Sequence, residues 1–233
     1  MKSLLQYINE MSQTIKPGSG IIVCDIDDTL LATDNSDMAV YKYEPGKEEQ
    51  KLSTSEYAKD PDKETHPDWF SFRDMRNAEK ITKSLKNGEI IKGNIKILNQ
   101  YIQLGYKFSF LTARAKEGTV MKAICDLLQY KGKDGKLHSI KDVISKDDCF
   151  AVNDREALDN NKWHSENPLA NLPENAGTPE RKSTVLKWLC DKYEHVVYVD
   201  DDKSNLRDAR KLKQKYPELK DNKRFTTIQA WNK

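Results

Sequence analysis

The stretch Ile21-Ile22-Val23-Cys24-Asp25-Ile26-Asp27-Asp28-Thr29-Leu30 joins an apolar run to a cluster of aspartates. The continuous apolar run at residues 21–24 is typical of a strand in a parallel sheet that is covered on both faces. Asp25 begins where this run ends, and Asp27 follows two residues later. The pattern therefore predicts a buried strand whose carboxyl end carries acidic side chains.

Predicted helices and strands alternate along most of the chain. Apolar periodicity predicts helices over residues 3–15, 94–104, 116–130, 178–193 and 204–216, and strands over residues 106–111, 149–152, 196–199 and 225–228. Strands separated by helices specify right-handed crossovers and a parallel sheet. The predicted fold class is α/β, with a Rossmann-like parallel sheet sandwiched by helices.

Residues 32–92 interrupt this alternation, and we interpret them as a small insertion in a core made of residues 1–31 and 93–233. The segment 44–68 is crowded with Lys, Glu, Asp and Pro and has almost no core-forming residues. A helix-like stretch near residues 73–85 follows Trp69-Phe70-Ser71-Phe72. We expect these aromatic rings to anchor the insertion onto the core.

Polar side chains follow three of the predicted strands, at the point where each strand ends. They are Asp25 and Asp27, Thr112 and Arg114, and Asp200, Asp201 and Asp202. Ligands in open α/β sheets bind outside the carboxyl ends of the strands. The topology therefore sends all three clusters to the same edge of the sheet.

Acidic residues on one edge repel each other unless a cation neutralises them. Carboxylate oxygens without clustered His or Cys favour a hard ion, and Mg²⁺ is the usual choice when a phosphate supplies further ligands. One aspartate could then act as a nucleophile and form an aspartyl-phosphate. A second carboxylate could protonate the leaving oxygen and afterwards activate water.

The motifs at these strand ends resemble those of the haloacid-dehalogenase (HAD) superfamily of phosphatases. Asp25-x-Asp27-x-Thr29 resembles the first motif, and Thr112 after residues 108–111 resembles the second. Asp200-Asp201 after residues 196–199 resembles the fourth. The third motif is a lysine near the start of the preceding helix. Lys182 fits best, because we expect Thr178 to cap that helix, and Lys187 is the alternative.

This resemblance implies a role for each matching residue. Asp25 would be the nucleophile and a Mg²⁺ ligand, and Asp27 the general acid/base, with its backbone carbonyl on the metal. Asp200 would be a direct ligand, and Asp201 a ligand that acts directly or through water. Thr112 and Lys182 would stabilise charge on the transferring phosphoryl group.

Other polar residues near the motifs have simpler interpretations. We expect Asp28 and Asp202 to serve as capping or solvated residues, and Thr29 to order its turn. Asn205 would orient the last aspartates or cap a helix. Arg114 is either a surface arginine or a bidentate phosphate clamp.

The resemblance implies a Mg²⁺-dependent phosphomonoester hydrolase, with residues 32–92 in the place of a small cap or flap. Thr112-x-Arg114 together with Lys182 resembles the 3′-phosphatase domain of phage polynucleotide kinase/phosphatase, so nucleic-acid 3′-phosphate ends or nucleotides are one expected substrate class. A small phosphorylated metabolite is the alternative substrate. A non-catalytic phosphate-binding module is the alternative from another class. No kinase P-loop is present in the sequence.

Composition gives no sign of a nucleic-acid or membrane protein. The chain has 39 Lys and Arg against 37 Asp and Glu, no apolar run of membrane-span length and no signal-peptide pattern. The four cysteines lack Cys-x-x-Cys spacing, so we expect buried, reduced thiols, and the four histidines lack metal-ligand spacing. We expect a cytoplasmic protein with no membrane contact and no obligate protein partner.

Overall fold

The computed structural model describes residues 16–33, 35–36, 38–154, 166–220 and 224–231. Its centre is a five-stranded sheet in the order β10-β7-β1-β11-β12. These strands are β10 (Phe150–Ala151), β7 (Lys107–Thr112), β1 (Gly20–Cys24), β11 (His195–Asp200) and β12 (Phe225–Gln229). Every neighbouring pair is parallel, which confirms the predicted parallel α/β sheet. The expected helix over residues 3–15 lies outside the described residues.

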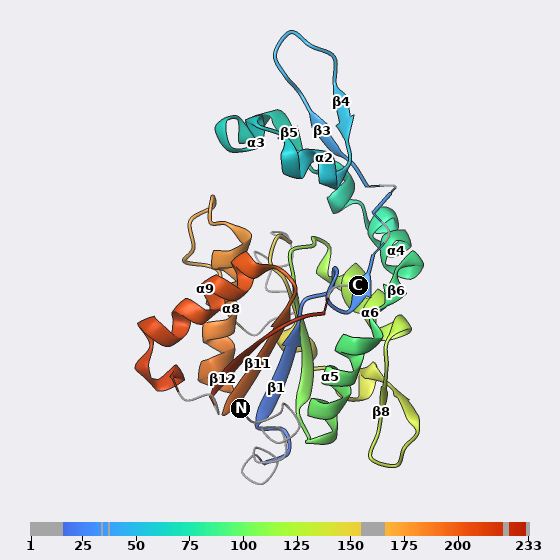
Figure 1. The fold of residues 1–233 in the computed structure, drawn as a ribbon, viewed down its shortest axis with the longest axis vertical. Helices are drawn as coiled ribbons and strands as arrows, with labels where there is room; N and C mark the ends of the chain where they lie inside the picture. Colours follow the sequence, from blue (N-terminus) through green and yellow to red (C-terminus); the bar gives the residue numbers. More distant parts are fainter. Residues whose placement is uncertain (1–15, 34, 37, 155–165, 221–223, 232–233) are drawn as a thin grey trace.

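Helices cover both faces of this sheet (Figure 1). They are α5 (Lys92–Gln103), α6 (Glu117–Leu127), α8 (Thr178–Lys192) and α9 (Lys203–Lys215). Successive side chains of a strand point to opposite faces. Ile22 and Cys24 of β1 accordingly join the apolar cluster under α5 and α6, whereas Ile21 and Val23 join the cluster under α8 and α9. Because β1 is buried on both sides, its sequence is apolar without a break.

Two predicted helix ends are wrong. The helix expected to reach residue 130 ends at Leu127, and the chain continues into an antiparallel hairpin of β8 (Gln129–Lys131) and β9 (Leu137–Ser139). Gly135, with φ +78°, supplies the left-handed residue of the hairpin turn. At the start of α8 the N-cap is Gly177, and Thr178 is already helical.

The described residues of the insertion form a two-stranded pair, a small three-stranded sheet and three α-helices. β2 (Leu31–Ala32) pairs with β6 (Glu89–Ile90) at its two ends. β3 (Val40–Lys42) pairs with β4 (Gln50–Leu52) and β5 (Phe70–Ser71), and the helices are α2 (Thr54–Lys59), α3 (Asp62–Thr65) and α4 (Ala78–Asn87). The small sheet with α2 and α3 projects beyond the carboxyl ends of the central strands, while α4 lies beside α6 (Figure 1).

Short 3₁₀ helices complete the described chain. They are η1 (Pro67–Trp69), η2 (Arg73–Arg76), η3 (Ile140–Asp142), η4 (Lys146–Asp148) and η5 (Pro217–Leu219).

The aromatic rings of the insertion pack among themselves. Phe70 and Phe72 both meet Tyr57 edge to face at 5.1 Å between ring centroids, and Trp69 stacks on His66 at 4.0 Å. The expectation that these rings anchor the insertion onto the core is therefore wrong. The apolar cluster of the core instead takes in Met38, Ile81 and Leu85, the last two from α4.

All four cysteines are buried and free, as expected. Among the described residues, no helix combines the length and apolar character needed to cross a membrane.

Candidate active site

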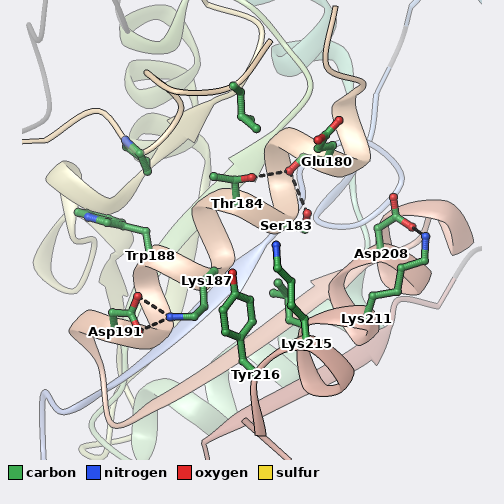
Figure 2. A pocket seen from close by; sticks show the side chains of 13 residues that line it. Glu180, Ser183, Thr184, Lys187, Trp188, Asp191, Asp208, Lys211, Lys215 and Tyr216 are labelled. Carbon is green, nitrogen blue, oxygen red and sulfur yellow. Dashed lines mark hydrogen bonds and ion pairs between the residues drawn. The ribbon is translucent and has the colours of Figure 1, made fainter. Parts of the chain in front are cut away.

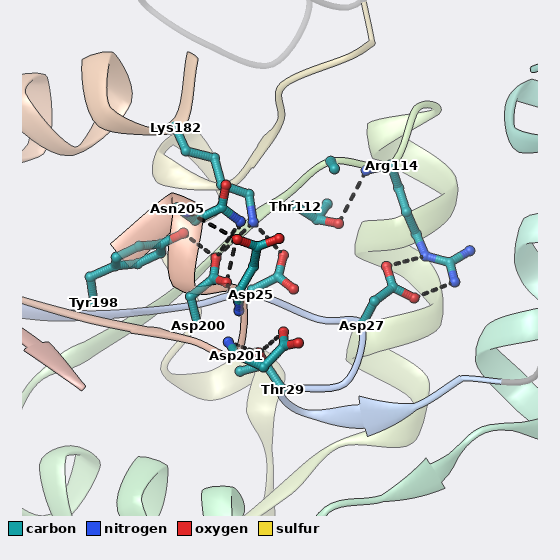
Figure 3. A network of polar contacts seen from close by, with 12 residues as sticks. Asp25, Asp27, Thr29, Thr112, Arg114, Lys182, Tyr198, Asp200, Asp201 and Asn205 are labelled. Carbon is teal, nitrogen blue, oxygen red and sulfur yellow. Dashed lines mark hydrogen bonds and ion pairs between the residues drawn. The ribbon is translucent and has the colours of Figure 1, made fainter. Parts of the chain in front are cut away.

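The carboxyl ends of β1, β7 and β11 bring the predicted residues to one edge of the sheet (Figure 3). Asp25 continues β1, since its N–H donates to the carbonyl of Val199 at 2.8 Å. Thr112 and Asp200 are the last residues of β7 and β11. Because these three strands are neighbours, their terminal side chains face a common space.

After Asp25 the chain leaves the sheet through a tight turn. The carbonyl of Ile26 accepts hydrogen bonds from the N–H groups of Thr29, Leu30 and Leu31 at 2.9–3.3 Å. Asp28 adopts a left-handed φ of +53° and is exposed, which agrees with its interpretation as a solvated residue. The turn separates the first two aspartates, so that Asp27 points away from Asp25 (Figure 3).

Lys182 lies between two carboxylates. Its Nζ is 2.8 Å from Asp25 Oδ1 and 2.8 Å from Asp200 Oδ2, and the residue is 2 % exposed. It is the fifth residue of α8, one residue further into the helix than we expected, because the N-cap is Gly177. Lys187 instead lies in a groove on the outer side of α8 and α9, paired with Asp191 at 2.5 Å (Figure 2). Of the two candidate lysines, Lys182 is the one in this site.

Asp200 is fully buried and receives hydrogen bonds from several donors. Tyr198 donates its hydroxyl, Asn205 donates Nδ2 at 3.1–3.2 Å, and the Asp202 N–H donates at 2.8 Å. This confirms that Asn205 orients an aspartate. The Asp202 side chain caps α9, as expected, by accepting from the N–H groups of Ser204 and Asn205.

Replacing Tyr198 with phenylalanine should destabilise the protein, because the buried carboxylate of Asp200 loses a donor. We expect the free energy of unfolding to fall by about 1.5–3 kcal/mol in urea denaturation without divalent cation. Tyr216→Phe is the matched control, since its ring contact with Lys187 needs no hydroxyl, and it should change stability by less than about 0.5 kcal/mol. Equal losses in the two variants would contradict the role given to the Tyr198 hydroxyl.

Three carboxylates form a compact oxygen cluster. One oxygen each from Asp25, Asp200 and Asp201 lie within 4.8 Å of one another. Asp201 is oriented by Thr29, whose hydroxyl donates to Asp201 Oδ1 at 3.0 Å and accepts from its N–H at 3.1 Å. The hydroxyl of Thr29 therefore bonds to the end of the neighbouring strand, and only its backbone N–H contributes to its own turn.

The cluster is electrostatically unfavourable without a cation. Burial raises the pKa of Asp25 to about 8; Lys182 opposes this shift, whereas Asp200 and Asp27 add to it. Burial also raises the pKa of Asp201 above its ordinary value. A bound cation would favour the ionised carboxylates. A donor set made only of carboxylate oxygens suits a hard divalent ion such as Mg²⁺.

Asp27 is bound by Arg114 rather than directed at the oxygen cluster. Arg114 Nε donates to Asp27 Oδ2 at 2.8 Å and Nη2 donates to Oδ1 at 2.6 Å, while Thr33 donates its hydroxyl to Oδ1 at 2.6 Å. Burial alone would raise the pKa of Asp27, but the charge and hydrogen bonds of Arg114, with the Thr33 bond, lower it below the ordinary value. Asp27 is consequently a carboxylate in this arrangement.

Arg114 is 9 % exposed, so it is not a surface arginine. Its N–H donates to Thr112 Oγ1 at 3.2 Å, which connects the end of β7 to the Arg114 turn. The guanidinium is engaged with Asp27, and its use as a phosphate clamp stays a prediction.

Four residues that contact this site were not predicted from the sequence. They are Tyr198 and Thr33, and also Asn35 and Ser84, which both accept a hydrogen bond from Arg114 Nη2. Tyr198 could have been found, because it lies two residues before Asp200 on one strand and so points to the same side. Thr33, Asn35 and Ser84 belong to the polar insertion, and nothing in their sequence context distinguishes them from surface residues.

Comparisons of the chain with models of protein families, with curated proteins and with solved structures found no match. The Rossmann-like α/β fold class therefore rests on the sheet topology, and a functional assignment rests on the geometry of the site.

Proposed function

We propose that this chain is a Mg²⁺-dependent phosphomonoester hydrolase of the HAD type, with Asp25 as the nucleophile. The observation that supports this most is the position of Lys182, whose Nζ is 2.8 Å from both Asp25 and Asp200 at the carboxyl edge of the sheet. Thr112 ends β7 and Asp201 directly follows β11, the two strands on either side of β1. Motif residues that lie far apart in the sequence are therefore close together at the carboxyl edge of the sheet. Parallel α/β sheets bind their ligands at this edge.

In the first step an oxygen of Asp25 attacks phosphorus, and the bond from phosphorus to the ester oxygen breaks. The leaving alcohol takes a proton from Asp27, and an aspartyl-phosphate remains on Asp25. Lys182 and Thr112 stabilise the negative charge of the phosphoryl group. Mg²⁺ bound by Asp25, Asp200 and Asp201, with the backbone carbonyl of Asp27, would supply further neutralising charge.

In the second step water attacks phosphorus and gives its proton to Asp27. Inorganic phosphate leaves, and the carboxylate of Asp25 is restored. The ion pair with Arg114 keeps Asp27 in the ionised form that this step requires. The first step requires a protonated Asp27, and the carboxyl group can then keep a hydrogen bond from Arg114 through its unprotonated oxygen.

Removing divalent cations with a chelator should abolish turnover, and adding Mg²⁺ should restore it. Below a pKa of about 8, Asp25 holds a proton that the cation must displace. We therefore expect the apparent Mg²⁺ affinity, measured by calorimetry, to weaken as the pH falls below about 8, by up to about tenfold per pH unit. Asp25→Asn should bind Mg²⁺ more weakly and with a smaller pH dependence. An identical pH dependence in both proteins would contradict the assignment of Asp25 as a ligand.

For the substrate, we propose nucleic-acid 3′-phosphate ends or nucleotides, on the basis of Thr112-x-Arg114 and Lys182. Rates on 3′-phosphorylated oligonucleotides, compared with rates on a panel of phosphorylated metabolites, test this choice. A preference of kcat/KM for the oligonucleotides would support it. Equal or faster hydrolysis of a metabolite would remove it in favour of the alternative substrate class, while leaving the phosphatase mechanism intact.

A further inference from the structure

The guanidinium of Arg114 is bound from two sides, by the core and by the insertion. Nε and Nη2 each donate to Asp27, and Nη2 also donates to Asn35 Oδ1 at 3.2 Å and to Ser84 Oγ at 3.0 Å. Asn35 follows β2, and Ser84 lies on α4. Side chains of the insertion therefore contact the arginine that binds Asp27.

These contacts close into a ring of hydrogen bonds. Ser84 donates its hydroxyl to Asn35 Oδ1 at 2.7 Å, and Asn35 Nδ2 donates to Thr33 Oγ1 at 3.3 Å. Thr33 donates in turn to Asp27 Oδ1, which also accepts from Arg114 Nη2. Each member of the ring thus restrains its neighbours, and Asp27 is one of these members.

The ring is attached to a part of the insertion that packs on the core. Ser84 is 3 % exposed, and its helix neighbours Ile81 and Leu85 belong to the apolar cluster of the core. Asn77 caps the start of α4 by accepting from the N–H groups of Glu79 and Lys80. The hydroxyl of Ser84 is thereby placed by a packed helix rather than by a loop.

Packing alone does not enclose Arg114. A cavity of about 150 Å³ adjoins it, lined by Asp27, Asn35, Met38, Met75, Ala113 and Arg114. A guanidinium beside such a space needs directed bonds to keep one orientation. Asn35 and Ser84 provide them as uncharged acceptors, so they orient Arg114 without competing with Asp27 for its charge.

We propose that Asn35 and Ser84 are positioning residues of the active site, which act through Arg114 to fix Asp27. This proposal rests on the proposed function, because it assigns a purpose to the placement of Asp27. In this proposal, side chains of the insertion help to form the catalytic site, whether or not the insertion also contacts the substrate.

A double-mutant cycle tests whether the two residues act through Arg114. Ser84→Ala and Asn35→Ala should each lower kcat by about tenfold with a smaller change in KM, and Arg114→Ala by about 100-fold. Adding Ser84→Ala or Asn35→Ala to Arg114→Ala should lower kcat no further, because the residue they position is already gone. Multiplying effects in the double variants would overturn the proposal, since they would mean independent structural roles.

Thr82→Ala is the matched control on the same helix. The Thr82 hydroxyl bonds to the carbonyl of Ala78 at 2.8 Å within α4, so its loss should change kcat by less than about twofold. An effect of Thr82→Ala as large as that of Ser84→Ala would also overturn the proposal. If Ser84→Ala fails to fold, Asn35→Ala at the half-buried Asn35 provides the same test.

A second measurement needs no enzymatic activity. The hydrogen exchange of the Arg114 Nε–H group, followed by NMR, should accelerate by about tenfold or more in Ser84→Ala and in Asn35→Ala. Unchanged exchange would overturn the positioning role even if kcat falls. Absence of any Asp25-dependent turnover in the unaltered protein would count against the proposed function instead, and the exchange experiment would still decide the positioning role.

Discussion

Replacing Asp25 with asparagine should abolish phosphomonoester hydrolysis, with a loss of about 10⁴-fold or more in kcat. The amide has almost the size of the carboxylate, but it is a poor nucleophile and cannot carry a phosphoryl group as an acyl phosphate. It also removes one oxygen ligand from the cluster with Asp200 and Asp201. Hydrolysis of p-nitrophenyl phosphate in Mg²⁺ measures the effect.

Asp28→Asn is the matched control, since it makes the same chemical change three residues away at an exposed position. Asparagine tolerates the left-handed φ of this residue, so we expect a rate within about twofold of the unaltered protein. Equal rates for Asp25→Asn and the unaltered protein would contradict the mechanism in which Asp25 is the nucleophile. Binding of inorganic phosphate without any turnover would favour the non-catalytic phosphate-binding module.

Replacing Lys182 with methionine should have the largest effect on stability. Lys182 is buried between Asp25 and Asp200, so its loss leaves two buried carboxylates without a cationic partner. Removing one partner from a buried ion pair costs about 3–5 kcal/mol of unfolding free energy, which urea denaturation without divalent cation would measure. The same variant should lower kcat by about 100-fold or more, because in the proposed mechanism the lysine stabilises the charge of the transferring phosphoryl group.

Lys187→Met is the control, one turn further along α8. Lys187 pairs with Asp191, whose side chain is 62 % exposed, and such pairs contribute about 0–1 kcal/mol. Similar losses of stability in the two variants would contradict the central place of Lys182. Mg²⁺ should restore part of the stability of Lys182→Met, since a cation in the cluster would replace part of the lost positive charge.

The central sheet could be predicted because burial on two faces leaves a distinct sequence pattern. The apolar runs at residues 21–24 in β1 and 196–199 in β11 are each followed directly by an aspartate, so both the strands and the polar edge follow from the order of residues. The insertion lacks such a pattern. Its rings at Tyr57, Phe70 and Phe72 bury one another locally, which the sequence does not distinguish from packing on the core.

The candidate active site also contains residues that could be predicted from the sequence and residues that could not. Asp25, Thr112 and Asp200 end strands, and the parallel topology alone brings them together. The ring through Asn35, Ser84 and Arg114 joins residues 87 positions apart at its widest contact, between Asp27 and Arg114, and its bonds to Ser84 depend on how α4 packs. Side chains brought together only by tertiary packing leave no local periodicity or spacing to detect.

The most direct test of the account is the identity of the phosphorylated residue. The protein would be mixed with a phosphomonoester and Mg²⁺, quenched with acid during turnover, digested and analysed by mass spectrometry. The account predicts one added phosphoryl group on the peptide that contains Asp25, located on Asp25 itself and absent in Asp25→Asn. A phosphoryl group on another residue, or steady turnover by Asp25→Asn, would contradict it.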